Sequence, residues 1–452
     1  MNKTLRSATA AVLMLTTSTW SVVAAAAPVA PEAALSDEVA LASATQEREQ
    51  VAAWLQRDDV RQQMTRLGVS PEQAGELVAA LSDAEIRDLA GKLDEAPAAA
   101  GFLRGGADLP VAAGHRHPRS HQGVLVHPLR ALMPVNVRRR GRLLAAALSV
   151  IVLAGCMTPQ ALDLRERPPL SRELTEVPFF PQREFQCGPA TLAMVSTYLG
   201  SPVTPDELAP SLYTPGREGS LAAEMIARAR LRGFIPQQLQ PELRALAQAL
   251  AEGSPVIVRQ NNGLSWLPVW HYAVVVGLDA ERSEVVLRSG ETARMTMSWS
   301  VFDRTWARAD RWAIRLLPVD SDWPASVTAA DVSRQLLAMA RVAPGLAQPG
   351  LHRASQRWPS ETALWLSLAD VGERLQGLDA AESALRDALL VQPEQPLLLN
   401  NLADVLLRGG RPDEALPLAR QALRGADRAE IRDTLRAVEA ALAHQGVTAP
   451  EA

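Results

Sequence analysis

The chain has 452 residues and a mass of 48.7 kDa, and 47% of its residues are hydrophobic, so it can build two or three domains with cores of their own. Its 46 basic and 50 acidic side chains leave a formal charge of −4, which gives no reason to expect a nucleic-acid partner. The two cysteines of the sequence, Cys156 and Cys187, are too few for a disulfide scaffold or a four-cysteine zinc site. Each cysteine therefore needs an explanation of its own.

The first 26 residues have the pattern of a secretory signal peptide. Lys3 and Arg6 precede an apolar stretch from Ala10 to Val23, and alanines follow at positions 24–26. We therefore expect residues 1–26 to direct export. The alternative is a short buried helix.

Residues 27–100 have the pattern of a small helical module. Ser70-Pro71-Glu72-Gln73 and Ser82-Asp83-Ala84-Glu85 both have the form of a capping box, which predicts one short helix after Ser70 and another after Ser82. Apolar residues recur on one face of these helices, as is typical of a small bundle. The module resembles small, uncharacterised exported proteins of proteobacteria.

Residues 101–132 resemble neither neighbouring segment, and we expect them to be an unstructured junction. Four of the seven histidines fall within thirteen residues of this junction: His115, His117, His121 and His127. A metal-binding tract is one interpretation, but the spacing fixes no ligand geometry. The other is an unselected junction, because Leu109–Leu162 lacks any Asp or Glu and shows no hydrophobic periodicity.

A second export signal lies inside the chain at residues 133–155. Its basic run ends at Arg142, and the twelve apolar or small residues from Leu143 to Ala154 are too few to span a hydrocarbon core of about 30 Å. The sequence Leu153-Ala154-Gly155-Cys156 resembles the signal of a bacterial lipoprotein. The resemblance implies that Cys156 carries the lipid and begins the mature protein, with a linker over 156–172. The alternative is a buried structural thiol.

Two export signals in one chain conflict, because the first already commits the protein to translocation. We therefore hypothesise that two neighbouring genes have been joined, and that the functional product starts near Met133.

The sequence around Cys187 predicts a nucleophile. Gln186-Cys187-Gly188-Pro189 leads from a loop into a helix whose apolar face continues to Leu199. At a helix amino terminus the dipole and the free N–H groups favour the thiolate, which is the nucleophilic form, and they can also hold an oxyanion. Gln182 is placed to donate a second hydrogen bond to that oxyanion. The alternative is a structural thiol.

A cysteine nucleophile needs a base, and His271 is the candidate. It stands near the start of the apolar β run Trp270–Leu278, after the predicted strand Pro255–Gln260 and a polar loop. His352 and His444 belong to later helical sequence. A lone histidine at a strand edge is more often a packing residue, but its pairing with Cys187 favours catalysis.

The order of Gln182, Cys187 at a helix start and His271 on a strand resembles the papain-like double-glycine peptidases that process bacteriocins. The resemblance runs from about Val177 to Pro318 and predicts an α+β peptidase domain over residues 173–320. It implies that Cys187 is the nucleophile, His271 the general base and Gln182 the oxyanion donor.

The third catalytic position departs from that family's pattern. If the strand of His271 turns at Asp279–Ser283 and returns through Glu284–Ser289, antiparallel pairing puts roughly residues 289–291 beside His271. The family has Asp followed by Pro there, whereas this chain has Ser289 followed by glycine. Ser289 can orient the imidazole but cannot stabilise the imidazolium as a carboxylate does, and Glu291 is the alternative.

Residues 328–446 contain a repeat with a period of 34 residues, which is the tetratricopeptide period. Identical residues at this offset are Leu368/Leu402, Ala369/Ala403, Asp370/Asp404, Ala381/Ala415, Ala388/Ala422 and Leu389/Leu423. The sequence predicts a turn at Gly409-Gly410 and a final helix over Ile431–Ala443. The repeats resemble tetratricopeptide repeats, whose concave face usually binds peptide or protein, and an ordinary helical bundle is the alternative.

Together these patterns predict an exported cysteine peptidase of α+β fold with an all-α repeat array and a small helical amino-terminal module. We expect it in the cell envelope, lipid-anchored on the periplasmic side or free in the periplasm. Its expected partners are a peptide or protein substrate, a protein bound by the repeats and the membrane, with no metal and no cofactor. An ABC transporter module is excluded, because no Gly-x4-Gly-Lys-Ser/Thr occurs. The competing hypothesis is a catalytically silent peptidase-like scaffold, which the missing Asp at position 289 favours.

Overall fold

The computed structural model describes residues 28–31, 38–66, 70–94, 171–183, 186–212, 219–265 and 267–448. The chain divides into one unit of Met1–Leu93 with Pro168–Ala452 and a second unit of Asp94–Arg167. The predicted signal peptide, the histidine-rich junction, the internal signal and Cys156 lie outside the described residues. None of the helices in the described ranges is long and apolar enough to cross a membrane.

The described part of the amino-terminal module contains four helices: α2 (Glu38–Gln56), α3 (Asp58–Arg66), α4 (Pro71–Ala79) and α5 (Asp83–Asp94). The capping box predicted at Ser82 is confirmed, because Ser82 N–H donates to Glu85 Oε2 at 2.7 Å and Glu85 N–H donates to Ser82 Oγ at 3.4 Å. At Ser70 the hydroxyl accepts from the N–H of Gln73 but donates to Glu72. Five buried apolar residues of this module form a small core together with Ala227 of a later helix: Val51, Ala80, Leu81, Ile86 and Ala90.

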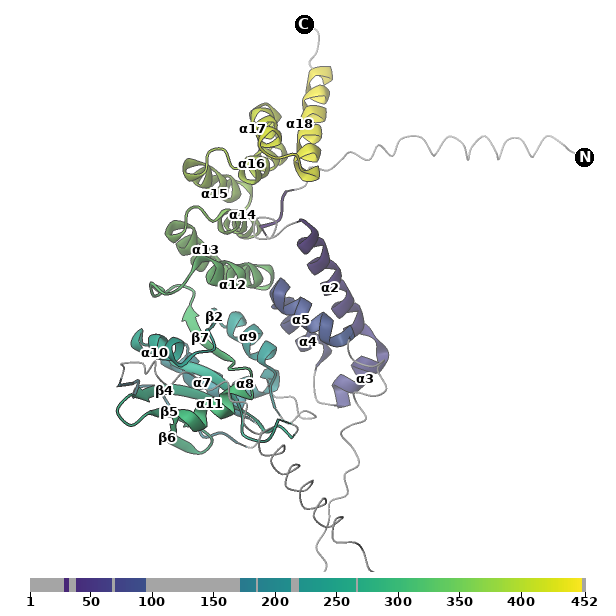
Figure 1. Cartoon of the computed structure of the whole chain (residues 1–452). Helices are drawn as coiled ribbons and strands as arrows, with labels where there is room; N and C mark the ends of the chain where they lie inside the picture. The colour runs from purple at the N-terminus through teal and green to yellow at the C-terminus, as the bar shows by residue number, and fades with distance from the viewer. Residues whose placement is uncertain are drawn as a thin grey trace, which may run out of the picture. The chain divides into compact units, whose positions relative to one another are not determined.

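The middle of the chain is built on an antiparallel sheet (Figure 1). Its strands are β1 (Arg172–Glu173), β2 (Phe234–Gln238), β3 (Val256–Asn261), β4 (Trp270–Asp279), β5 (Glu284–Ser289), β6 (Thr292–Ser298) and β7 (Ala313–Pro318). The order across the sheet is β2-β7-β3-β4-β5-β6, and β1 pairs with the far end of β4. Helix and sheet are thus mixed, as the α+β prediction requires.

Five helices accompany this sheet: α7 (Cys187–Tyr198), α8 (Pro205–Leu212), α9 (Ala222–Leu231), α10 (Leu243–Ala251) and α11 (Trp299–Ala307). Helix α7 packs against β4 and β3, and nine consecutive residues from Gly188 to Ser196 are buried. This burial explains why α7 is apolar on nearly all sides instead of showing a single apolar stripe. Phe302, Trp306 and Trp312 close the other end of the core.

Seven helices follow the sheet: α12 (Ala329–Val342), α13 (Pro344–Arg357), α14 (Thr362–Gln376), α15 (Leu378–Val391), α16 (Pro396–Arg408), α17 (Pro412–Gly425) and α18 (Ala429–Thr448). We refer to them as the helical array. Each packs against the next in chain order. Gly410 ends the predicted turn between α16 and α17 with φ +75°, a conformation that glycine adopts without strain. The final helix is longer than the predicted Ile431–Ala443.

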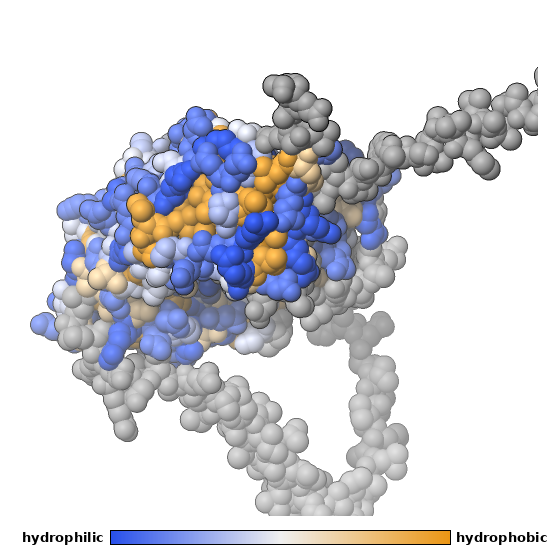
Figure 2. Space-filling model, turned by 90° about the horizontal axis from the view of Figure 1, so that it is seen from above, coloured by the Kyte–Doolittle hydropathy of each residue, from blue (hydrophilic) through white to orange (hydrophobic). Residues whose placement is uncertain are grey.

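Figure 2 looks down on the molecule from the end at which α17 and α18 lie in Figure 1. Apolar side chains gather on this face in one area, which hydrophilic side chains border. Several leucines of the array are only partly buried, among them Leu389, Leu416, Leu418 and Leu435.

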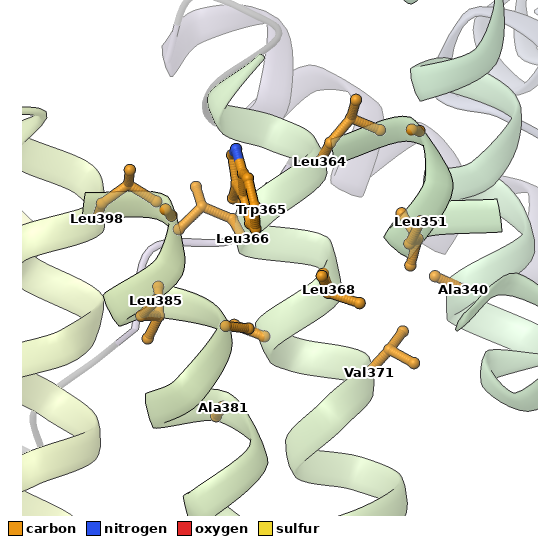
Figure 3. Packing of buried hydrophobic residues seen from close by; sticks show 14 of the residues in the cluster. Ala340, Leu351, Leu364, Trp365, Leu366, Leu368, Val371, Ala381, Leu385 and Leu398 are labelled. Atoms are coloured by element: carbon orange, nitrogen blue, oxygen red, sulfur yellow. The ribbon is translucent and has the colours of Figure 1, made fainter. Parts of the chain in front are cut away.

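The core of the array follows the 34-residue period of the sequence (Figure 3). Ala347, Ala381 and Ala415 stand at this spacing and are at most 1% exposed, and Ala354, Ala388 and Ala422 repeat the pattern at 0%. Alanine at these positions lets neighbouring helices approach closely, while Leu351, Leu385 and Leu398 fill the space between them. The helical array fits the repeat prediction, and its identity as tetratricopeptide repeats stays a prediction.

Arg230 on α9 joins the three parts of the described chain. Its side chain is fully buried and donates to the carbonyl of Ala80 at 2.5 Å, to Glu85 Oε1 at 2.8 Å and to Gln335 Oε1 on α12 at 2.7 Å. Although burial raises the pKa of Glu85, the charge and hydrogen bond of Arg230 outweigh it and hold that pKa below its usual value. In this chain the amino-terminal helices therefore contact α9 and α12 through one buried side chain.

Candidate active site

Cys187 is the first residue of α7, as predicted, and its thiol is half-buried. Gly188 follows because a side chain would not fit: a Cβ at this position would lie 2.4 Å from Ser220 Oγ. Backbone groups of Tyr272, Gly188 and Cys187 itself lie close enough to the sulfur to lower the pKa of the thiol. The thiol therefore faces both the helix start and strand β4.

His271 is the second residue of β4 and precedes Tyr272, whose backbone lowers the pKa of the Cys187 thiol. Its imidazole is half-buried, whereas the neighbouring Trp270 is 52% exposed. The structure thus brings the candidate nucleophile and the candidate base to the same end of the same strand.

Ser289, the last residue of β5, lies beside His271, with Ser289 Oγ 2.8 Å from His271 Nε2. The contact depends on a β-bulge in β4. Pairing passes from Gly277–Val286 to Val275–Leu287, which shifts the register by one residue. Without that shift Ser289 would face the opposite side of the sheet from His271, because side chains alternate along a strand. Glu291 is exposed in the turn that follows.

Gln182 is buried and lies between the ends of β4 and β5. Its Nε2 donates to the carbonyl of Tyr272 at 3.2 Å, and its Oε1 accepts from Gly290 N–H at 3.0 Å. The backbone N–H of Gln182 donates to Gly290 O at 3.0 Å. These bonds fix the amide and leave one of its two N–H groups for another acceptor.

Burial shifts the pKa values of both members of the pair. Burial raises the pKa of the Cys187 thiol more than the backbone groups lower it, and burial lowers the pKa of His271. A neutral thiol therefore faces a neutral imidazole at pH 7. The desolvation of the half-buried sulfur thus opposes the effect of its position at a helix start, and the thiolate stays a prediction.

Two residues of the site were not predicted from the sequence. Tyr272 accepts the hydrogen bond of Gln182 through its carbonyl, and its ring packs edge-on against Trp312 with centroids 5.7 Å apart. Gly290 clamps Gln182 and adopts φ +58°, which favours glycine. The position of Tyr272 next to His271 in the sequence could have indicated its role. The position of Gly290 in the turn after β5 could have done the same.

A small cleft and an exposed apolar loop lie near the candidate site. A cleft of about 180 Å³ lies next to the N-cap of α7 and is lined by Phe180, Pro181, Arg183, Gln186, Ala190, Pro205 and Asp206. The loop before His271 exposes the apolar side chains of Leu264, Leu267, Val269 and Trp270. Within the described ranges no three His, Cys, Asp or Glu side chains are grouped so that they could hold a metal ion.

A cysteine at a helix start, a histidine on the adjacent strand and a buried glutamine together define a candidate site for nucleophilic hydrolysis. Residues 174–314 match the model of the Peptidase_C39 like family, and residues 6–107 match a family of unknown function, DUF6627. The first match supports a peptidase function in general. No curated protein matches the chain significantly.

Two solved structures are similar to this part of the chain. A Bacillus anthracis protein assigned as a C39-like peptidase is 17% identical, with 33% of this chain and 98% of that chain covered and a TM-score of 0.29. The peptidase domain of Streptococcus ComA, a bi-functional ABC transporter involved in a quorum-sensing pathway, is 24% identical, with 32% and 99% covered and a TM-score of 0.26.

The contact between Ser289 and His271 predicts the behaviour of two variants. Ser289→Ala removes the bond to Nε2 and should lower kcat about tenfold or more, because the imidazole loses its orientation. Ser289→Asp should preserve or raise kcat, since a carboxylate holds the ring and stabilises its charged form. It should also move the acid limb of the pH–rate profile to higher pH, because a carboxylate beside the imidazole raises the pKa of His271. A loss of rate in folded Ser289→Asp would contradict this role and direct attention to Glu291.

Proposed function

We propose that the chain is a cysteine peptidase that uses Cys187 and His271 on a papain-like fold. The observation that carries the proposal is that Gln182 donates to the carbonyl of Tyr272, next to His271, on the strand against which the helix of Cys187 packs. Ser289 binds Nε2, so Nδ1 is the ring nitrogen left to take the thiol proton. Because thiol and imidazole are neutral at rest, this proton moves as the sulfur attacks.

The proposed reaction has two steps. The thiol proton of Cys187 passes to His271 while the sulfur attacks the peptide carbonyl, and the imidazolium then protonates the leaving amine as the C–N bond breaks. Water next attacks the thioester with His271 as base, which releases the new carboxyl group and restores the thiol. The free N–H of Gln182 and the N–H of Cys187 are the proposed donors to the oxyanion of each step.

The competing function is a catalytically silent scaffold. Ser289 in place of a carboxylate and the raised pKa of Cys187 favour it. Incubation of the protein with a degenerate peptide library, with new amino termini identified by mass spectrometry, separates the two functions. The peptidase produces new termini at a defined sequence context, and the scaffold produces none.

We also propose export and lipid attachment at Cys156. The intact mass of the protein extracted from membranes should then equal the chain from Cys156 onward plus its acyl groups, since two or three acyl chains hold a protein to a bilayer firmly. An unmodified Cys156, with tryptic peptides of residues 36–96 covalently continuous with the peptidase domain, would contradict this processing and indicate a periplasmic protein of three modules.

The helical array is the proposed docking part of the molecule. Its support is the 34-residue period, the close-packed alanines at that spacing and the apolar area in Figure 2. Tetratricopeptide-like repeats would bind a protein partner or present a substrate to the peptidase domain.

A further inference from the structure

A short segment of the amino terminus is bound to the helical array. Asn401 on α16 accepts a hydrogen bond from the backbone N–H of Val29 through Oδ1, and its Nδ2 donates to the carbonyl of Val29, both at 2.8 Å. Val29 is 2% exposed and belongs to the hydrophobic core of the array, although 372 residues separate it from Asn401. One side chain of the array thus holds both polar backbone groups of a single residue.

The clamp contacts the backbone of Val29 and not its side chain. A residue in extended conformation points its N–H and C=O to the same side, which is the geometry that one carboxamide can match with its acceptor and its donor. Pro28 and Pro31 limit the conformations open to the free segment, because each proline fixes its own φ and restricts the residue before it, which is Ala30 for Pro31. The segment therefore loses little conformational entropy when it binds.

Helix α16 is built to hold a ligand at this position. Asn401 is itself 8% exposed, and the Nδ2 of Asn400 donates to its Oδ1 at 3.3 Å, which fixes the orientation of the amide. Within the described residues, Oδ1 of Asn400 and Oδ1 of Asp404 are buried without a hydrogen-bond partner. Buried acceptors without partners are uncommon, so this face of α16 has capacity for further backbone donors.

We propose that this face of the helical array is a binding site for an extended polypeptide and that residues 28–31 of the same chain occupy it as an intramolecular ligand. The site is closed to other segments while Val29 is in place, and it opens when residues 28–31 are removed or displaced. The inference rests on the docking role proposed for the array and not on the peptidase activity. Removal of the amino terminus, as in a product that starts at Cys156, would therefore expose the docking site.

The first test is hydrogen exchange on the full chain. Val29 and Ala30 carry the backbone N–H groups of residues 28–31, and the amide of Val29 should be protected in the parent chain. Asn401→Ala should lower this protection at least tenfold, whereas the control Gln356→Ala, which changes an exposed side chain of α13, should leave it intact. Exchange of Val29 at the rate of an unfolded peptide in the parent chain would overturn the proposal.

The second test uses a fluorescent synthetic peptide of residues 27–33 and fluorescence anisotropy. Val29→Asp places a charge at a buried position, so the full-length variant should release its own segment and bind the peptide at least tenfold more tightly than the parent does. Adding Asn401→Ala to Val29→Asp should abolish the binding. Equal affinity for parent and Val29→Asp, or binding that survives the loss of Asn401, would overturn the proposal. Peptidase turnover, measured in parallel, should not change in any of these variants.

Discussion

Cys187→Ala should lower turnover of a cleaved peptide by at least about 10³-fold, because no other group in the site can form the thioester. The change from a thiol to a methyl group at a helix start alters little packing, so the variant should unfold at the same denaturant concentration as the parent. Turnover is measured on the peptide identified from the library, with purified full-length protein.

The matched control for Cys187→Ala is Ser196→Ala on the same helix. Ser196 is fully buried and its Oγ has no hydrogen-bond partner within the described residues, so its loss should affect neither turnover nor folding. Equal turnover by Cys187→Ala and the parent would exclude Cys187 as the nucleophile and support the silent scaffold.

Arg230→Met should give the largest loss of stability. It leaves the carbonyl of Ala80 and Gln335 Oε1 without a donor and Glu85 without its counter-charge, and breaking a buried pair in this way costs about 3–5 kcal/mol. Hydrogen exchange of α4 and α5 in the full-length chain measures the effect locally. Their protection should fall about 10²-fold or more.

The pH dependence of the same variant provides an independent check. A carboxyl whose folded pKa is depressed stabilises the fold above its unfolded pKa, and this contribution is lost as the pH falls through the folded pKa. In the parent chain, the hydrogen-exchange protection of α4 and α5 should therefore fall below about pH 4.5. In Arg230→Met this pH-dependent loss of protection should be absent. The control is Arg228→Met on the same helix, which is only half-buried and should cost about 1 kcal/mol or less. Unchanged protection in Arg230→Met would show that the amino-terminal helices do not depend on this contact.

Much of the candidate site could be predicted because its signals are local. Cys187 precedes Gly188-Pro189 at a helix start, and a hairpin with alternating side chains brings Ser289 toward His271 from the sequence alone. The predicted contact between Ser289 and His271 is present in the structure, but it depends on a β-bulge that the sequence did not indicate. Pairing at the turn of this hairpin is offset by one residue, and the bulge at Val276 restores the face that the simple hairpin assumed.

The features that could not be predicted involve residues far apart in the chain. Arg230 meets Glu85 across 145 residues and Asn401 meets Val29 across 372, and no periodicity or motif carries that information. The opposing effects on the pKa of Cys187 could not be weighed from the sequence for a related reason. A helix start is visible in the sequence, whereas the desolvation of the sulfur depends on the strands and loops that surround it.

The central claim is that His271 activates Cys187 toward a peptide carbonyl, and labelling with a peptidyl chloromethyl ketone tests it most directly. The rate of covalent modification, followed by intact mass and assigned to the tryptic peptide that contains Cys187, is compared with that of free cysteine at the same pH. The account predicts a rate at least about 10²-fold higher, and His271→Ala should remove this excess. Modification no faster than that of free cysteine, or a rate unaffected by His271→Ala, would contradict a catalytic pair.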